Sequence, residues 1–157
     1  MGEASWDSSR GEHVRVAPTT DLEAVRALGV ANGLDEGGRD DRSLVAAWAA
    51  RTADGAMVGA VALEEAPGLA VVNWLSVEAA FRGRGLATRL LAALEDEARR
   101  RGVQLLWATA RAPGFFLANG FVPVDEGPEV AYLLGECPDC PQYGRECRPR
   151  AVVKDLG

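Results

Sequence analysis

The pattern of apolar and polar positions predicts that the chain begins with a strand and a helix. From His13 to Ala17, apolar and polar residues alternate, which is typical of a strand with one buried face. Thr20 and Glu23 then have the spacing of a capping box, which predicts that a helix begins at Asp21. Apolar residues recur at helical spacing beyond this point, and we expect the helix to end near Asn32.

Three further apolar runs predict an antiparallel meander. Ser43–Arg51 and Ala56–Glu65 are joined by a turn that contains Asp54-Gly55, a dipeptide typical of β-hairpins. Pro67-Gly68 marks a second turn, and Ala70–Val77 is the third strand of the meander.

The second half of the chain predicts a helical crossover between two strands. Leu86–Arg101 carries apolar residues at helical spacing and ends on a basic turn, so we expect a long helix there. Val103–Ala108 is the next predicted strand, and a crossover helix allows the two strands to pair in parallel. A short helix at Ala112–Asn119 and a final strand pair at Phe121–Val124 and Glu129–Leu134 complete the expected order.

Length and composition are those of one globular domain. The chain has 157 residues, of which 48% are hydrophobic and 25% charged. Its net charge of −6 argues against a nucleic-acid partner, and no apolar run approaches the length of a membrane span. Residues 1–12 are polar and lack the apolar core of a signal peptide, so we expect a disordered tail and a cytoplasmic protein.

A glycine-rich turn between the meander and the long helix has the features of an anion site. A strand that enters a glycine turn and then a helix presents unpaired backbone N–H groups, and the helix dipole favours negative charge there. Arg82, Arg84 and Arg89 add positive charge, so we interpret the turn as a pyrophosphate site. A Rossmann dinucleotide site is disfavoured, because its glycines would follow the first strand of a parallel sheet. The turn consists of Arg82, Gly83, Arg84, Gly85, Leu86, Ala87 and Thr88.

Several motifs resemble those of the GNAT superfamily of N-acetyltransferases. Arg82-x-x-Gly85-x-Ala87 resembles its acetyl-CoA signature, and Phe115–Phe121 resembles its late helix ending in Gly-Phe. The hairpin ending Val58–Val61 resembles its second and third strands. The resemblance implies an α/β fold with a mixed, mostly antiparallel sheet, flanking helices and splayed fourth and fifth strands. It implies a domain at residues 13–135, with residues 136–157 as a cysteine-bearing tail packed on it.

A closer likeness concerns amino-acid acetyltransferases related to N-acetylglutamate synthase. Thr109–Phe116 resembles a stretch of that group, and the tail with Cys137, Cys140 and Cys147 resembles its cysteine-bearing end. The three cysteines are also compatible with zinc ligands, with His13, an acid or water as the fourth. Free thiols that pack the tail and a redox-labile Cys137–Cys140 pair are the alternatives.

The resemblance also implies roles for residues around the glycine turn. Amides from Arg82 to Thr88 would bind the pyrophosphate of acetyl-CoA, and the Thr88 hydroxyl would add a donor. Backbone groups of Leu75, Ser76 and Val77 would run beside the pantetheine arm, and an amide near Ser76 or Val77 would polarise the thioester carbonyl.

The residues that would move protons depart from the family pattern. Val71 occupies the slot of a Glu that acts as base in many members, and Phe116 occupies that of a Tyr that protonates the thiolate. Asn73 replaces an Arg found in many synthase-like members, which weakens glutamate as the substrate. The candidate replacements are Glu64 and Glu65 at the end of the predicted strand Ala56–Glu65, Tyr132, Tyr143 and His13.

The sequence thus favours an acetyl-CoA-dependent N-acetyltransferase acting on the amine of a small molecule, with an amino acid as one candidate. A peptide or protein amine is the second enzymatic hypothesis. A GNAT-fold module that binds acyl-CoA with little turnover is the non-enzymatic alternative, because Val71 and Phe116 lack acid–base groups. A homodimer is compatible with each of these hypotheses.

Overall fold

The computed structural model describes residues 6–7, 14–34, 44–66, 68–110, 113–134 and 150–157. These residues form one mixed sheet whose strand order is β1-β2-β3-β4-β5-β6-β8-β7. Every pair is antiparallel except β5 with β6, which is parallel. The strands are β1 (Trp6–Asp7), β2 (Val14–Thr19), β3 (Leu44–Thr52), β4 (Met57–Ala66), β5 (Leu69–Val77), β6 (Leu105–Ala110), β7 (Val122–Val124) and β8 (Arg150–Asp155). The α-helices are α1 (Leu22–Ala31), α2 (Leu86–Arg100), α3 (Gly114–Ala118) and α4 (Pro128–Leu134).

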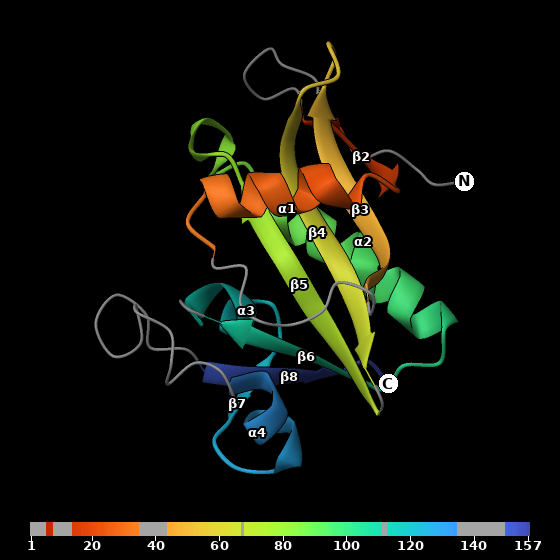
Figure 1. Ribbon diagram of the computed structural model, residues 1–157, viewed down its shortest axis with the longest axis vertical. Coiled ribbons are helices and arrows are strands. Elements are labelled where there is room, and N and C mark those ends of the chain that lie inside the picture. Colours follow the sequence, from red (N-terminus) through yellow and green to blue (C-terminus); the bar gives the residue numbers. More distant parts are fainter. Residues whose placement is uncertain (1–5, 8–13, 35–43, 67, 111–112, 135–149) are drawn as a thin grey trace.

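Helices cover both faces of the sheet. In Figure 1, α1 and α4 lie in front of the sheet and α2 lies behind it. The side chains agree, since Val25 of α1 packs with Trp74 of β5, and Val130 of α4 packs with Val71 and Trp107. The largest cluster lies on the α2 side and includes Leu90. Any residue of β4 or β5 can therefore be assigned to the α2 face or to the α1/α4 face.

The long crossover helix forms where its sequence pattern places it. Its buried residues recur at helical spacing, which gives α2 one apolar face against the sheet. The basic residues Arg99 and Arg100 occupy its last turn, where the helix dipole favours positive charge. The prediction of a helix at Leu86–Arg101 is confirmed to within one residue.

Strands β5 and β6 pair only over their first halves. The paired residues are Ala70 with Leu106, Val71 with Trp107, and Val72 with Ala108. Beyond Val72 and Ala108 the two strands have no recorded pairing, and Figure 1 shows them running apart. This divergence is the splay of the fourth and fifth strands of the meander-crossover unit, which the resemblance implied.

The predicted final strand pair is wrong in one of its two members. Residues 129–134 form part of α4, and not a strand. Pro128 opens the helix, a position that proline favours, and Val130 and Leu133 are buried at i,i+3 spacing. The apolar run was short enough to fit a strand or a helix, and packing against Val71 and Trp107 selects the helix.

The partner of β7 comes instead from the end of the chain. Strand β8 lies between β6 and β7 and pairs antiparallel with both of them. Ala151 and Val152 are fully buried, so this segment is part of the sheet core and not a tail packed on its outside. A domain that ended at residue 135 would lack this strand.

The opening segment also contributes to the sheet. Trp6 pairs with Arg15 and Asp7 pairs with Val14, which makes β1 an edge strand within the stretch that we expected to be disordered. His13 and the three cysteines, Cys137, Cys140 and Cys147, lie outside the described residues. Within the described ranges, no helix combines the length and apolar character needed to cross a membrane.

Candidate active site

The glycine turn adopts a backbone conformation that suits an anion. Gly83 and Gly85 have φ values of 80° and 79°, in the left-handed region that side chains other than glycine disfavour. Gly85 is the N-cap of α2, and no side chain caps the helix in its place. The chain can therefore turn directly from η2 (Ala79–Phe81) into α2 with its amide groups exposed.

The first turn of α2 leaves its amide hydrogens available. The first helical bond recorded at this end runs from the amide of Arg89 to the carbonyl of Gly85, at 3.1 Å. Within the described part of the chain, no acceptor is recorded for the amides of Leu86, Ala87 and Thr88. Leu86 is buried and anchors the turn, while Thr88 is exposed. These amides and the helix dipole together favour a negatively charged group at this position.

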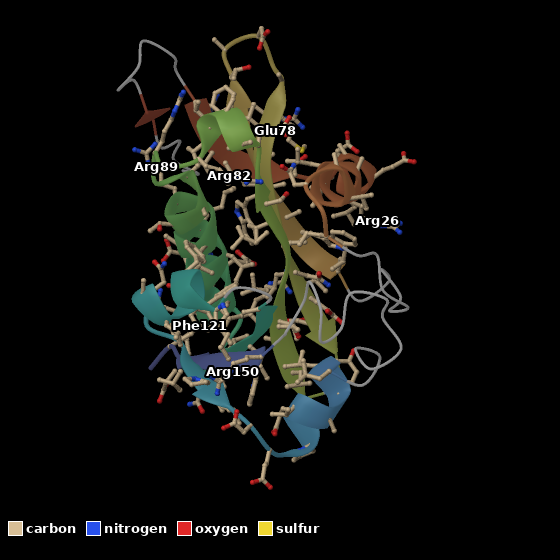
Figure 2. The ribbon with its side chains drawn as sticks, turned by 90° about the vertical axis from the view of Figure 1, so that its left-hand side faces the viewer. Arg26, Glu78, Arg82, Arg89, Phe121 and Arg150 are labelled. Atoms are coloured by element: carbon tan, nitrogen blue, oxygen red, sulfur yellow. The ribbon has the colours of Figure 1, made fainter. Side chains whose placement is uncertain are left out.

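The arginines of the turn brace it. Arg82 donates from Nε to the carbonyl of Val77 at 2.9 Å and from Nη2 to Oδ1 of Asn32 at 3.1 Å. Asn32 also donates to Oε1 of Glu78 at 3.3 Å, and Figure 2 shows Arg82 and Glu78 close together. The guanidinium of Arg84 lies 4.7 Å from the ring centre of Phe81. The guanidinium of Arg82 thus fixes the turn against α1, beyond the general positive charge that the sequence indicated.

A bulge in β5 sits beside the splay. The register with β4 shifts between Ala60 and Ala62, and Trp74 has a φ of 55°. The amide of Glu78 donates to the carbonyl of Val58 at 2.8 Å. Because the hydrogen-bonding direction alternates along a strand, the amide of Ser76 also faces β4. The amides of Leu75 and Val77 then face the gap between β5 and β6.

Trp74 fixes the position of α1 on the sheet. It is 6% exposed, and a Cβ atom at Gly29 of α1 would lie 2.6 Å from its ring. Arg26 lies over the same ring at 5.9 Å, and Figure 2 shows this arginine on the α1 side of the molecule. Among the described residues, the indole nitrogen of Trp74 and the buried hydroxyl of Ser76 have no hydrogen-bond partner.

Glu64 is the centre of a polar cluster on the α1/α4 face. It is 1% exposed, and its Oε1 accepts a hydrogen bond from Nδ2 of Asn73 at 3.1 Å. Its Oε2 accepts from the hydroxyl of Tyr132 at 3.2 Å. Tyr132 reaches this carboxylate because Val130 and Leu133 seat α4 on the sheet. The sequence named all three residues but did not predict that they meet, since Tyr132 was expected on a strand.

The remaining candidates have other surroundings. Phe116 is 9% exposed and its ring makes edge-to-face contacts with those of Phe115 and Phe121, at centroid distances of 5.3 and 5.1 Å, so it packs in the core. Glu65 forms an ion pair with Arg101 at 3.6 Å. Within the described ranges, no group of three or more His, Cys, Asp or Glu side chains could hold a metal ion.

A comparison with protein families identifies the kind of fold that carries this site. The family model for the acetyltransferase (GNAT) family matches residues 14–121, which is well over half of the chain. The matched region runs from the first residue of β2 to Phe121 after α3, and it includes the glycine turn and the splay.

Solved structures with the same fold are numerous and distant in sequence. N-acetylglutamate synthase from Neisseria gonorrhoeae, complexed with coenzyme A and N-acetyl-glutamate, is 22% identical with a TM-score of 0.69. The match covers 92% of this chain and 35% of that one, so this chain spans about a third of the synthase. Rv2747 from Mycobacterium tuberculosis, in complex with CoA, is 22% identical with a TM-score of 0.66, covering 92% and 99%. A GNAT-family acetyltransferase from Staphylococcus aureus is 13% identical with a TM-score of 0.67, covering 92% and 99%.

Proposed function

The chain belongs to the acetyltransferase (GNAT) family, and on this premise we propose that it is an N-acetyltransferase that acetylates the amine of a small molecule. The family's acetyl donor is acetyl-CoA, the cofactor that the resemblance implied. The single observation that carries the proposal is that β5 and β6 stop pairing beyond Val72 and Ala108, while Arg82 of the glycine turn donates to the carbonyl of Val77 at the end of β5.

The donor side fits acetyl-CoA residue by residue. Of the amides from Arg82 to Thr88 that the resemblance implied, that of Arg82 donates to the carbonyl of Ala79 at 3.3 Å. The amides of Gly83 to Thr88, with the Thr88 hydroxyl, would hold the pyrophosphate, since none of Leu86, Ala87 and Thr88 has a recorded amide acceptor among the described residues. Backbone groups of β5 beyond the paired stretch would hydrogen-bond the pantetheine arm. When bound, acetyl-CoA supplies an acetyl thioester, whose carbonyl carbon is attacked by an amine.

Backbone amides supply the electrostatic part of the chemistry. The alternation along β5 directs the amides of Leu75 and Val77 into the gap, where a hydrogen bond to the thioester oxygen would stabilise the charge that develops on it. The sequence suggested that the amide of Ser76 could polarise the thioester carbonyl. Because that amide faces β4, Ser76 would instead offer the acceptor side its hydroxyl, which lies on the α1/α4 face and has no hydrogen-bond partner among the described residues.

An amino acid is the acceptor that we favour. The supporting observation is that N-acetylglutamate synthase from Neisseria gonorrhoeae, with N-acetyl-glutamate bound, shares this fold over 92% of the chain. Asn73, which pairs with Glu64, stands where synthase-like members have Arg, so we favour an amino acid other than glutamate. A peptide amine is the second acceptor class.

The non-enzymatic alternative is a module that binds acyl-CoA without turning it over. Val71 is fully buried among apolar residues and Phe116 packs in the core, so neither position of the family's acid and base carries a titratable group. This alternative predicts tight CoA binding with no amine-dependent reaction.

Two measurements on the wild-type chain test the proposal. Isothermal titration calorimetry with CoA measures donor binding, and a thiol-release assay with acetyl-CoA measures transfer to the L-amino acids, putrescine and short peptides. We expect saturable CoA binding and thiol release that depends on at least one amino acid. CoA binding with no release above the hydrolysis rate would favour the binding module, and absence of CoA binding would overturn both.

A further inference from the structure

Glu64 occupies a position that is costly for a carboxylate. At 1% exposed, it has lost almost all of its hydration, which is unfavourable unless hydrogen bonds replace the lost water. Two donors do so from other elements: Asn73 on β5, 9 residues away in sequence, and Tyr132 on α4, 68 residues away. Three elements therefore converge on one carboxylate, and an apolar residue at position 64 would leave both donors without this partner.

The sheet register puts this carboxylate at the base of the gap between β5 and β6. Glu64 is directly opposite Val71, and Val71 is directly opposite Trp107. The next pair, Val72 with Ala108, is the last before the strands separate, and Asn73 is the first residue beyond it. Side chains directly opposite in neighbouring strands lie about 5 Å apart at Cβ, so Glu64 projects beside Val71 on the α1/α4 face.

Resting on the function proposed above, we propose that Glu64 is the catalytic residue that accepts the proton of the acceptor amine, supplied from β4 because Val71 on β5 cannot. The acceptor enters as a primary ammonium and gives one proton to the Glu64 carboxylate. Its nitrogen then forms the C–N bond as the C–S bond of the thioester breaks. The second amine proton leaves with the sulfur as a thiol, and Glu64 returns its proton to water.

Asn73 and Tyr132 are the positioning residues of this arrangement. Each donates to a different oxygen of Glu64, which fixes the plane of the carboxylate. Tyr132 is 43% exposed while its hydroxyl contacts a buried group, so it connects the carboxylate to solvent. This connection gives the proton a route out after transfer.

Two other carboxylates, Glu65 and Glu95, have surroundings that differ from those of Glu64. Glu65 follows Glu64 on the same strand, so its side chain points to the opposite face, and it pairs with Arg101. Glu95 is 7% exposed on α2, where Lys154 donates to it at 3.0 Å. Both residues provide matched controls. Glu65→Gln controls for the loss of a charge on β4, and Glu95→Gln controls for the loss of a buried carboxylate.

Replacing Glu64 with Gln tests the proposal, because glutamine keeps the volume and the hydrogen-bonding capacity but not the basicity. For the best acceptor of the amino-acid and putrescine panel, we expect E64Q to lower kcat about 100-fold or more, within the range of general-base catalysis. The Kd for CoA should stay within about threefold of wild type, since the carboxylate does not touch the donor turn. E65Q and E95Q should keep kcat within about twofold.

Tyr132→Phe separates positioning from packing, since the ring remains and only the hydroxyl is lost. We expect kcat to fall about tenfold with little change in KM, and E64Q/Y132F should be no slower than E64Q alone, because the two act as one unit. If Glu64 and Tyr132 were purely structural, each substitution would lower the melting temperature, and the kcat loss of the double variant would be the product of the two single losses.

A binding readout without acetyl-CoA gives independent evidence. In ¹³C-glutamate-labelled apoprotein, the side-chain carboxyl resonance that E64Q removes should shift when the same amine is added. If wild type releases thiol and E64Q is equally fast, the Glu64 proposal is overturned while the proposed function stands. If wild type reacts with no amine and the resonance does not move, both are overturned together. An unshifted resonance with an active wild type contradicts direct contact with Glu64.

Discussion

The two sides of the gap between β5 and β6 are built in opposite ways. The proposed donor side is one contiguous turn, Arg82–Thr88, which would act through backbone amides that any residue other than proline could provide. The proposed acceptor side is a cluster of three side chains, from Glu64 on β4, Asn73 on β5 and Tyr132 on α4. A site made of backbone groups depends on the conformation of the chain. A site made of side chains depends on which residues are present and on the tertiary contacts that bring them together.

This difference explains why the donor side resembles the GNAT pattern and the acceptor side departs from it. Glycines at two left-handed positions suffice to preserve the turn, so its sequence signature stays readable. A carboxylate beside the gap can be supplied from either of two facing strands, because cross-strand neighbours project side by side. The proposed role of Glu64, which lies opposite Val71, would be such an exchange.

The largest effect on the donor side is expected from Gly85→Glu. A side chain at a φ of 79° strains the turn, and a carboxylate would be placed at the anion site, so we expect the Kd for CoA to rise about 100-fold or more. Gly55→Glu is the matched control, because Gly55 has a φ of 92° in the β3–β4 turn with open space around it. Calorimetry with CoA measures both, and unchanged affinity in G85E would contradict the assignment of the turn.

A smaller effect is expected where α1 meets the sheet. In Gly29→Ala the added Cβ would lie 2.6 Å from the Trp74 ring, so either the α1 helix or the ring must move. We expect this to lower the free energy of unfolding by about 1–3 kcal/mol. Because Trp74 lies on the α1/α4 face, we expect the KM for the amine to rise more than the Kd for CoA. Gly114→Ala on α3 has open space and serves as the control in urea unfolding. If the KM for the amine and the Kd for CoA rose equally, the acceptor side and the donor side could not be perturbed independently.

Asn32→Ala tests the hydrogen bond between the C-cap residue of α1 and the donor turn. Loss of the bond to Arg82 should let the turn sample other conformations, and we expect the Kd for CoA to rise about three- to tenfold. Asn119→Ala is the matched control, since Asn119 caps α3 through the carbonyl of Phe115 at 2.8 Å, as Asn32 caps α1 through that of Leu28 at 2.9 Å. If the two variants bind CoA equally well, Arg82 does not need Asn32.

The smallest effect is expected at the far end of α2. Hydrogen bonds from Arg100 and then Arg101 lower the pKa of Glu97, so its stabilising contribution is present above the pKa of the unfolded chain and is lost as the pH falls through the folded value. Because these pairs are partly exposed on the surface of one helix, Glu97→Gln should cost about 0.5 kcal/mol or less near neutral pH. Urea unfolding at acid and neutral pH should show that the difference in the free energy of unfolding between wild type and Glu97→Gln shrinks as the pH falls. The affinity for CoA should not change.

The sequence by itself determined the local part of this protein. The order from the first strand to the crossover helix, the hairpin at Asp54-Gly55 and the glycine turn all depend on periodicity and turn chemistry, which act over a few residues. Phe116 in the core could also be predicted, since its neighbours form an apolar helix end. Each of these predictions needs only residues that are close in the chain.

Only the tertiary structure decided the rest. Residues 128–134 became a helix because the row of Val71 and Trp107 gave its apolar side a surface to cover. Strand β8 entered the sheet between β7 and the edge of β6 that does not face β5. The pairing of Glu64 with Tyr132 follows from that helix and bridges 68 residues of sequence. The donor turn could be recognised from the sequence because backbone geometry is encoded locally. The acceptor cluster could not, because it exists only where three separate elements pack together.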